Sequence, residues 1–163
     1  MKFIVHTDGG SRGNPGEAAI GVVIERSKIK DQRSKIENTE KYDYPLPTTN
    51  YQLVTEFGKR IGETTNNVAE YTAVLEGLRN IKYQISKIKS DEKFIIQCYL
   101  DSLLVVQQLN GIFKIKDARL RDLLFKIKSL EQEIGGEITY THIPREENAR
   151  ADAFVNKALD GAM

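Results

Sequence analysis

Four acidic residues of the chain are of a type and placement that could hold a metal ion. Asp8 and Asp101 each come directly after a run of β-branched and apolar residues, which is typical of a strand that ends there. Glu70 and Asp152 fall within two segments of helical pattern. If the two strands are parallel neighbours, both of their acids reach the same edge of the sheet, where open α/β sheets place their functional sites.

The two helical acids carry spacing information of their own. Glu70 is followed at i+3 and i+7 by Ala73 and Gly77, so the helix face on which it lies can approach a sheet closely. We therefore expect its carboxylate to point toward the sheet edge rather than into water. Asp152 lies four residues after Asn148, which places these two polar side chains on one face of the last helix.

A cluster of four carboxylates predicts a particular chemistry. Like charges close to one another raise each other's pKa unless a cation neutralises them. Ligand sets made only of oxygen select Mg²⁺ or Mn²⁺. Two such ions ~4 Å apart stabilise both the attacking and the leaving oxygen in a phosphodiester displacement. The residues alone therefore indicate metal-dependent phosphoryl chemistry.

Each acid also has a purely structural interpretation. Asp8 could be an Asp-Gly turn residue, and Asp152 could be an exposed acid on a helix surface. Glu70 could close a capping box with Asn67, and Asp101 could be the N-cap of the helix that it precedes. These interpretations stay open for each residue taken alone. The expected convergence of all four acids on one edge is what favours the metal site.

The apolar pattern predicts three strands in succession and then an alternation of helices and strands. The expected strands span residues 2–7, 18–24, 51–61, 94–100 and 137–143, and three expected helices span 67–80, 102–109 and 147–159. A further long helix carries an apolar stripe over 120–130 and is closed by Gly135-Gly136. Residues 8–16 contain two glycine clusters and a proline, and they predict a tight, irregular turn. This order implies an α/β fold, with a mixed sheet that carries helices on its faces.

Length and composition bound the class of protein. The 163 residues, of which 40% are hydrophobic and 29% charged, predict a single domain over residues 1–163 with one hydrophobic core. Residues 25–50 include a run of mixed charges, and we expect them to form a solvated hairpin insertion or a partly mobile loop. The single cysteine, Cys98, excludes an internal disulfide and a thiolate zinc site.

Further expectations concern location and partners. The longest apolar run, 18–24, is far shorter than the ~20 residues of a membrane-spanning helix, and the N-terminus lacks a signal-peptide pattern. We therefore expect a soluble, cytoplasmic protein with no membrane partner. The net charge of +1 argues against tight, unspecific electrostatic binding of nucleic acid, although local basic patches remain possible. We expect a monomer without an obligate protein partner.

The four acids stand in motifs that resemble those of a type 1 ribonuclease H. The matching motifs are Asp8-Gly9-Gly10-Ser11 with Asn14-Pro15-Gly16, Thr65-Asn66-Asn67-Val68-Ala69-Glu70-Tyr71, Leu100-Asp101-Ser102, and His142-Ile143-Pro144-Arg145-Glu146-Glu147-Asn148 running into Ala151-Asp152. They span nearly the whole chain in the family's order, and jointly they are highly specific. The resemblance implies the ribonuclease H-like fold, a five-stranded mixed sheet of three antiparallel and two parallel strands flanked by about four helices.

The resemblance also implies an activity and a cofactor. It implies cleavage of the RNA strand of RNA/DNA hybrids, which leaves 5′-phosphate and 3′-hydroxyl ends. It further implies two Mg²⁺ ions, which Mn²⁺ can replace, held by the four acids. Asp8 is then the bridging ligand and Asp152 the ligand on the nucleophile side. Glu70 and Asp101 are the ligands on the leaving-group side.

Further residues acquire roles through the same resemblance. His142 is implied in proton transfer or product release, with a strand-end histidine of no catalytic role as the alternative. Substrate binding is implied for residues in or near the motifs, through amide and backbone groups at the minor groove and cations at phosphates. These residues are Gly9, Gly10, Ser11, Arg12, Asn14, Asn66, Asn67, Ser102, Lys114, Lys116, Arg145 and Asn148. For Asn14 a turn role, and for Asn67 an N-cap role, stays equally open.

The sequence also departs from the family's pattern. Leu103 stands where many members carry a polar residue that contacts a base, so we expect that contact to be absent. Residues 109–120 hold no separate basic protrusion, and Lys114 and Lys116 in this short linker are candidates for phosphate contacts. Two other functions therefore stay open. One is a non-catalytic module that binds hybrid or double-stranded RNA, and the other is a different enzyme on the same fold, such as a nuclease for double-stranded RNA.

Overall fold

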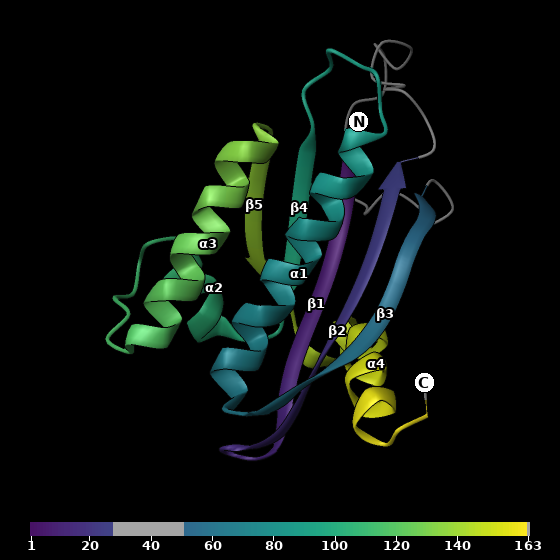
Figure 1. Ribbon diagram of the computed structural model, residues 1–163. Coiled ribbons are helices and arrows are strands. Elements are labelled where there is room, and N and C mark those ends of the chain that lie inside the picture. Colours follow the sequence, from purple (N-terminus) through teal and green to yellow (C-terminus); the bar gives the residue numbers. More distant parts are fainter. Residues whose placement is uncertain (28–50, 163) are drawn as a thin grey trace, which may run out of the picture.

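The structure is a computed structural model that describes residues 1–27 and 51–162 (Figure 1). Its elements are β1 (Lys2–Gly13), β2 (Gly16–Ser27), β3 (Tyr51–Thr64), α1 (Asn66–Ser86), β4 (Ile95–Leu100), α2 (Leu103–Leu109), α3 (Ala118–Ile134), β5 (Glu137–His142), the 3₁₀ helix η3 (Arg145–Asn148) and α4 (Ala149–Leu159). Most of the expected insertion, residues 28–50, lies outside the described residues.

The strands form one mixed sheet in the order β3-β2-β1-β4-β5. β2 pairs antiparallel with both β1 and β3, whereas β4 pairs parallel with both β1 and β5. Helices α1 and α3 pack together over one face, and α4 lies on the opposite face against β1, β2 and β3 (Figure 1). The described residues thus confirm the predicted α/β fold, with three antiparallel strands, two parallel strands and four α-helices.

The hydrophobic core lies between the sheet and α1. Phe3 and Val5 of β1 are buried and alternate with half-buried residues, so they lie on the face of the sheet that α1 covers. The apolar stripe that the helical spacing predicted is buried against this side, and it consists of Tyr71, Val74, Leu75 and Leu78. Burial of one such side chain contributes ~2 kcal/mol before the loss of chain entropy is counted. Within the described ranges, none of the helices combines the length and the apolar character needed to cross a membrane.

The glycine-rich stretch after Asp8 is strand rather than turn, so the prediction of an irregular turn over 8–16 is wrong. β1 continues to Gly13, which lies opposite Gly16 of β2, and the turn itself consists of Asn14 and Pro15. An unbroken antiparallel ladder with β2 bonds the backbone along this whole stretch, which outweighs the low strand propensity of glycine. Asp8 therefore lies within a long strand and not at its end.

Several elements also extend beyond their predicted ends. β3 runs to Thr64 instead of residue 61, and α1 runs to Ser86 instead of residue 80. The apolar stripe of α1 continues through Ile81, which is fully buried, and Ile85, which packs against the core. The last helix begins at Ala149, because residues 145–148 form a 3₁₀ turn before it.

Candidate metal centre

The centre forms where β4 ends beside β1. The parallel pairing of these strands includes His6 opposite Tyr99, and β4 ends one residue later, while β1 continues. Asp8 lies two residues beyond His6, and Asp101 lies two residues beyond Tyr99. Their side chains therefore meet in the space that β4 leaves open, which is why an acid inside a strand and an acid in a loop can share one site.

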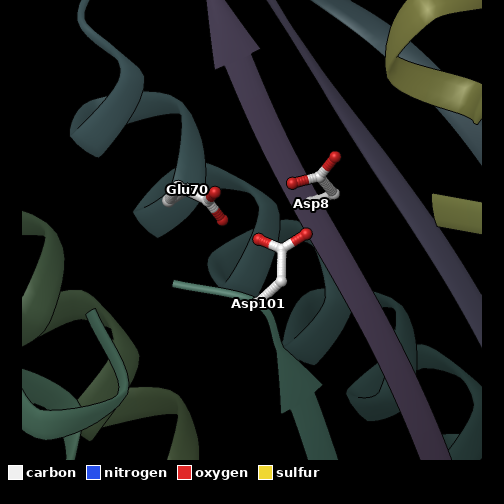
Figure 2. A group of neighbouring side chains, drawn as sticks. All are labelled: Asp8, Glu70 and Asp101. Carbon is white, nitrogen blue, oxygen red and sulfur yellow. The ribbon is translucent and has the colours of Figure 1, made fainter. Parts of the chain in front are cut away.

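Glu70 reaches the same point from α1. The helix lies so close to β1 that a Cβ atom on Gly9 would be 2.2 Å from the carbonyl carbon of Ala69, so the position requires glycine. Glu70 is buried and points to the sheet edge, as its spacing predicted. The ligand oxygens of Asp8, Glu70 and Asp101 all lie within 4.8 Å of one another. Figure 2 shows the three carboxylates turned toward a common space.

Asp152 joins this group from the opposite face of the sheet. Its helix, α4, approaches β2 so closely that a Cβ atom on Gly21 would be 2.0 Å from the carbonyl oxygen of Ala151. The carboxyl group of Asp152 is near enough to contribute to the raised pKa of Asp8, but it lies outside the group of three acids whose oxygens are all within 4.8 Å of one another. Its Oδ2 also accepts from Asn156 Nδ2 at 3.3 Å. All four predicted acids line one hollow of about 280 Å³.

Burial and mutual repulsion dominate the electrostatics of the cluster. Burial, followed by repulsion from Asp101 and contact with Asp152, raises the pKa of Asp8 to about 8. Burial, followed by repulsion from Asp8 and Asp101, raises the pKa of Glu70 well above its ordinary value. Among the described residues, Glu70 Oε2 is buried without a hydrogen-bond partner. A set of oxygen donors with an orphaned carboxylate oxygen fits a hard divalent cation.

Two of the purely structural interpretations of the acids are wrong. The N-cap of α1 is Thr65, whose hydroxyl accepts a backbone N–H of the first turn at 3.3 Å, so Glu70 does not close a capping box with Asn67. The N-cap of α2 is Ser102 rather than Asp101. A hydroxyl next to each acid satisfies the helix terminus, which leaves both carboxylates to face the hollow.

Some of the residues predicted to bind substrate line the hollow, and others bond to those that do. Gly9, Gly10, Ser11, Arg12 and Asn66 line it directly. Asn14 in the turn accepts from the backbone N–H of Asn66 at 3.1 Å, and Asn66 Oδ1 accepts from the backbone N–H of Ser11 at 2.9 Å. These bonds tie the β1–β2 turn to the start of α1 and shape one wall of the hollow. Asn67 is partly buried at the start of α1, and the Arg12 side chain pairs with Asp160.

Asn148 and Arg145 occupy different surroundings. Asn148 is 1% exposed, and its Nδ2 donates to the Thr7 carbonyl oxygen at 2.9 Å and to Asp101 Oδ2 at 3.4 Å. The structure therefore places it behind Asp101, where it is shielded from solvent. Arg145 is exposed at the rim of the hollow, 3.9 Å from Asp152 Oδ1.

The remaining predicted residues lie outside the lining of the hollow. His142 is the last residue of β5 and is exposed. Lys114 and Lys116 are exposed in the segment between α2 and α3. Leu103, at the start of α2, is 51% exposed. Sequence reasoning missed Asn156, whose spacing of four residues from Asp152 on one helix was the available signal.

Fold and site together define an α/β domain that gathers a cluster of carboxylates at one edge of its sheet. The model of the RNase H family matches residues 1–160. The chain belongs to the RNase H family.

Individual relatives agree with this assignment. LC11-RNase H1, solved in complex with an RNA/DNA hybrid, is 37% identical, with 98% of each chain covered and a TM-score of 0.75. Ribonuclease HI of Halobacterium salinarum is 34% identical over 95% of this chain and 63% of its own length. The bifunctional protein Rv2228c of Mycobacterium tuberculosis is 32% identical over 99% of this chain, and the chain spans only 36% of that relative.

Proposed function

We propose that the chain is an endoribonuclease that hydrolyses the RNA strand of RNA/DNA hybrids and leaves 5′-phosphate and 3′-hydroxyl ends. The observation that carries this proposal is the set of three carboxylates within 4.8 Å, with Asp152 beside them, in a chain of the RNase H family. The complex of LC11-RNase H1, 37% identical to this chain, with an RNA/DNA hybrid supports a hybrid as the substrate.

The four acids would hold two Mg²⁺ ions, which Mn²⁺ can replace. When bound, the two ions supply a lowered pKa for the attacking water and charge stabilisation for the leaving 3′ oxygen. Asp8 interacts with each of the other acids, whereas Glu70 interacts with Asp8 and Asp101. With this arrangement Asp8 would contact both ions, and Asp152 would hold the ion on the nucleophile side. Glu70 and Asp101 are then the ligands on the leaving-group side.

Residues around the acids orient the ligands and the substrate. Asn148 holds Asp101 in place through its amide, because one donor contacts both the carboxylate and the backbone of β1. Gly9 and Gly10 have no side chains, so β1 presents only backbone to the hollow at these positions and a sugar-phosphate backbone can approach it closely. His142 assists proton transfer or product release.

The hybrid is recognised along both sides of the hollow. Ser11, Asn14 and Asn66 form the wall that faces the minor groove, where amides and hydroxyls read the 2′-hydroxyl of the RNA strand. Asn67, Ser102 and the backbone of Arg12 extend this contact. Arg145, Lys114 and Lys116 contact phosphates, since their cationic groups are exposed.

Cleavage of matched substrates tests the proposal. Labelled RNA/DNA hybrid, double-stranded RNA and a DNA duplex with a single ribonucleotide are incubated with the protein and Mg²⁺. We expect cleavage of the RNA strand in the hybrid, with 5′-phosphate products. Equal cleavage of double-stranded RNA would contradict the proposed substrate. Binding without turnover at every Mg²⁺ and Mn²⁺ concentration would contradict the proposed catalysis.

A conservative substitution tests the metal cluster. Asp8→Asn is expected to lower cleavage by ~10³-fold or more, because the amide cannot bridge two cations. Folding and hybrid binding are expected to persist. Asp122→Asn is the matched control, since Asp122 is an exposed acid of α3 paired with Lys126. Full activity in Asp8→Asn is incompatible with the proposed mechanism.

The chain is also proposed to act as a monomeric, cytoplasmic domain over residues 1–163, with a hairpin insertion at 25–50. Light scattering of the purified chain at working concentration measures its mass. A stable dimer would contradict the first part of this proposal.

A further inference from the structure

The carboxyl end of α2 is held by side chains from other elements. Lys128 of α3 donates from Nζ to the carbonyl oxygen of Leu109, the last residue of α2, at 3.0 Å. The same ammonium group pairs with Glu131 at 3.2 Å, and Glu131 accepts from the Tyr140 hydroxyl at 2.6 Å. A cation in this place satisfies a carbonyl that has no partner within its own helix, and it interacts favourably with the helix dipole.

The segment between α2 and α3 continues directly from this anchored end. The Gln107 carbonyl oxygen accepts from the backbone N–H groups of Ile112 and Phe113 at 2.8 and 3.2 Å. Asn110 Nδ2 donates to the Tyr140 carbonyl oxygen at 3.2 Å. The segment has no regular secondary structure, yet its first residues are bonded both to α2 and to β5. Its course therefore depends on where the end of α2 lies.

Two lysines project from this segment. Ile115 is partly buried and packs against the core, whereas Lys114 and Lys116 on either side of it are exposed. With the apolar residue turned in, both ammonium groups stay on the outer side of the segment. A pair of cations held in this way loses less conformational entropy when it binds phosphates than a pair on a free loop would.

We propose that Lys128 is a positioning residue for hybrid binding. By holding the carboxyl end of α2, it sets the place from which the Lys114 and Lys116 ammonium groups meet the phosphate backbone. The proposal rests on the proposed function, in which these two lysines contact phosphates. Lys128 itself is directed to the Leu109 carbonyl and the Tyr140 ring, whose centroid lies 5.6 Å from Nζ, so it acts through the segment rather than on the substrate.

Lys128→Met tests this role, because it keeps the aliphatic stem and removes the ammonium group. Lys126→Met is the matched control, since Lys126 lies on the same helix, carries the same charge and pairs with Asp122. Binding of a fluorescent RNA/DNA hybrid is measured by anisotropy without divalent cations, so the readout does not require cleavage. We expect Lys128→Met to weaken binding ~3- to 10-fold and Lys126→Met to change it less than two-fold. Equal weakening by both variants would overturn the proposal.

A double-mutant cycle separates positioning from a general loss of charge. In a background of Lys114→Met with Lys116→Met, the Lys128→Met substitution is expected to have no further effect on binding. Additive effects would overturn the proposal.

Lys128→Arg is expected to keep most of the binding that Lys128→Met loses. Cleavage by Lys128→Met is expected to show the wild-type kcat with a raised KM. A protein that binds the hybrid but never cleaves it would contradict the proposed function while leaving this cycle interpretable.

Discussion

Asn148 connects the acidic cluster to the middle of the sheet, because a single amide nitrogen donates to Asp101 Oδ2 at 3.4 Å and to the Thr7 carbonyl oxygen at 2.9 Å. Asp101 lies beyond the end of β4, so the strand itself does not fix its side chain. The bond to Asn148 supplies the missing restraint from the opposite direction. An acid in a loop is thereby held against a strand that carries another acid, Asp8.

The first prediction concerns this amide. Asn148→Ala is expected to destabilise the protein by ~1–3 kcal/mol, since the buried Thr7 carbonyl loses its side-chain donor. Cleavage is expected to fall further than stability explains, because Asp101 is no longer oriented. The measurements are the free energy of unfolding in urea and kcat at saturating Mg²⁺. Asn80→Ala, a partly buried amide on α1 that bonds only Gln84 in the described structure, is the control. Unchanged kcat in Asn148→Ala would contradict the orienting role.

The second prediction concerns the approach of α1 to β1. Gly9→Ala is expected to cost ~3 kcal/mol or more, because its Cβ would lie 2.2 Å from a backbone carbon of Ala69, and backbone cannot yield as a side chain does. Gly10→Ala is the control, since its Cβ would meet Val155 Cγ1 at 3.6 Å, an ordinary contact. The melting temperatures of the two variants are compared with that of the wild type, and Gly9→Ala is expected to have the lowest. Equal melting temperatures would show that α1 can move away from the strand without loss.

These two sites also show what the sequence could and could not predict. The strand and helix order followed from apolar periodicity, and the convergence of four acids followed from their places relative to that order. The residue pattern could not show that Asp8 lies inside a strand, because glycine propensity favours a turn and only the long ladder with β2 overrides it. Nor could it show that Asn148 faces Asp101, because that contact depends on the 3₁₀ turn that precedes α4.

The third prediction concerns the pH dependence of stability without metal. Folding raises the pKa of Asp8 from its ordinary value of 3.8 to about 8, with burial as the main cause. A raised pKa in an acid means that its stabilising contribution is complete below pH ~4 and is lost as the pH rises through ~8. Asp8→Asn removes this loss. The difference in unfolding free energy between Asp8→Asn and the wild type is therefore expected to shift in favour of the variant by several kcal/mol between pH 4 and 9.

Urea unfolding in the presence of a chelator, repeated at several pH values, measures this difference. Asp122→Asn is expected to show no such growth, since its carboxyl is exposed and paired only with Lys126 in the described structure. A constant difference between Asp8→Asn and wild type across the range would mean that the cluster carries no pH-dependent penalty in the folded protein.

The fourth prediction concerns the response to divalent cations. In the proposed function Mg²⁺ binds the cluster of the folded protein and not the unfolded chain, so it is expected to stabilise the wild type by RT ln(1 + [Mg²⁺]/Kd) and to raise its melting temperature. The rise is expected to be larger at pH 8 than at pH 5, because cations must displace the protons that the raised pKa values of Asp8 and Glu70 retain. Calorimetric titration in two buffers of different ionisation enthalpy measures the protons released. Asp8→Asn should lose most of the response and Asp122→Asn should keep it. An equal Mg²⁺ response in all three proteins would place the cation at a site other than this cluster.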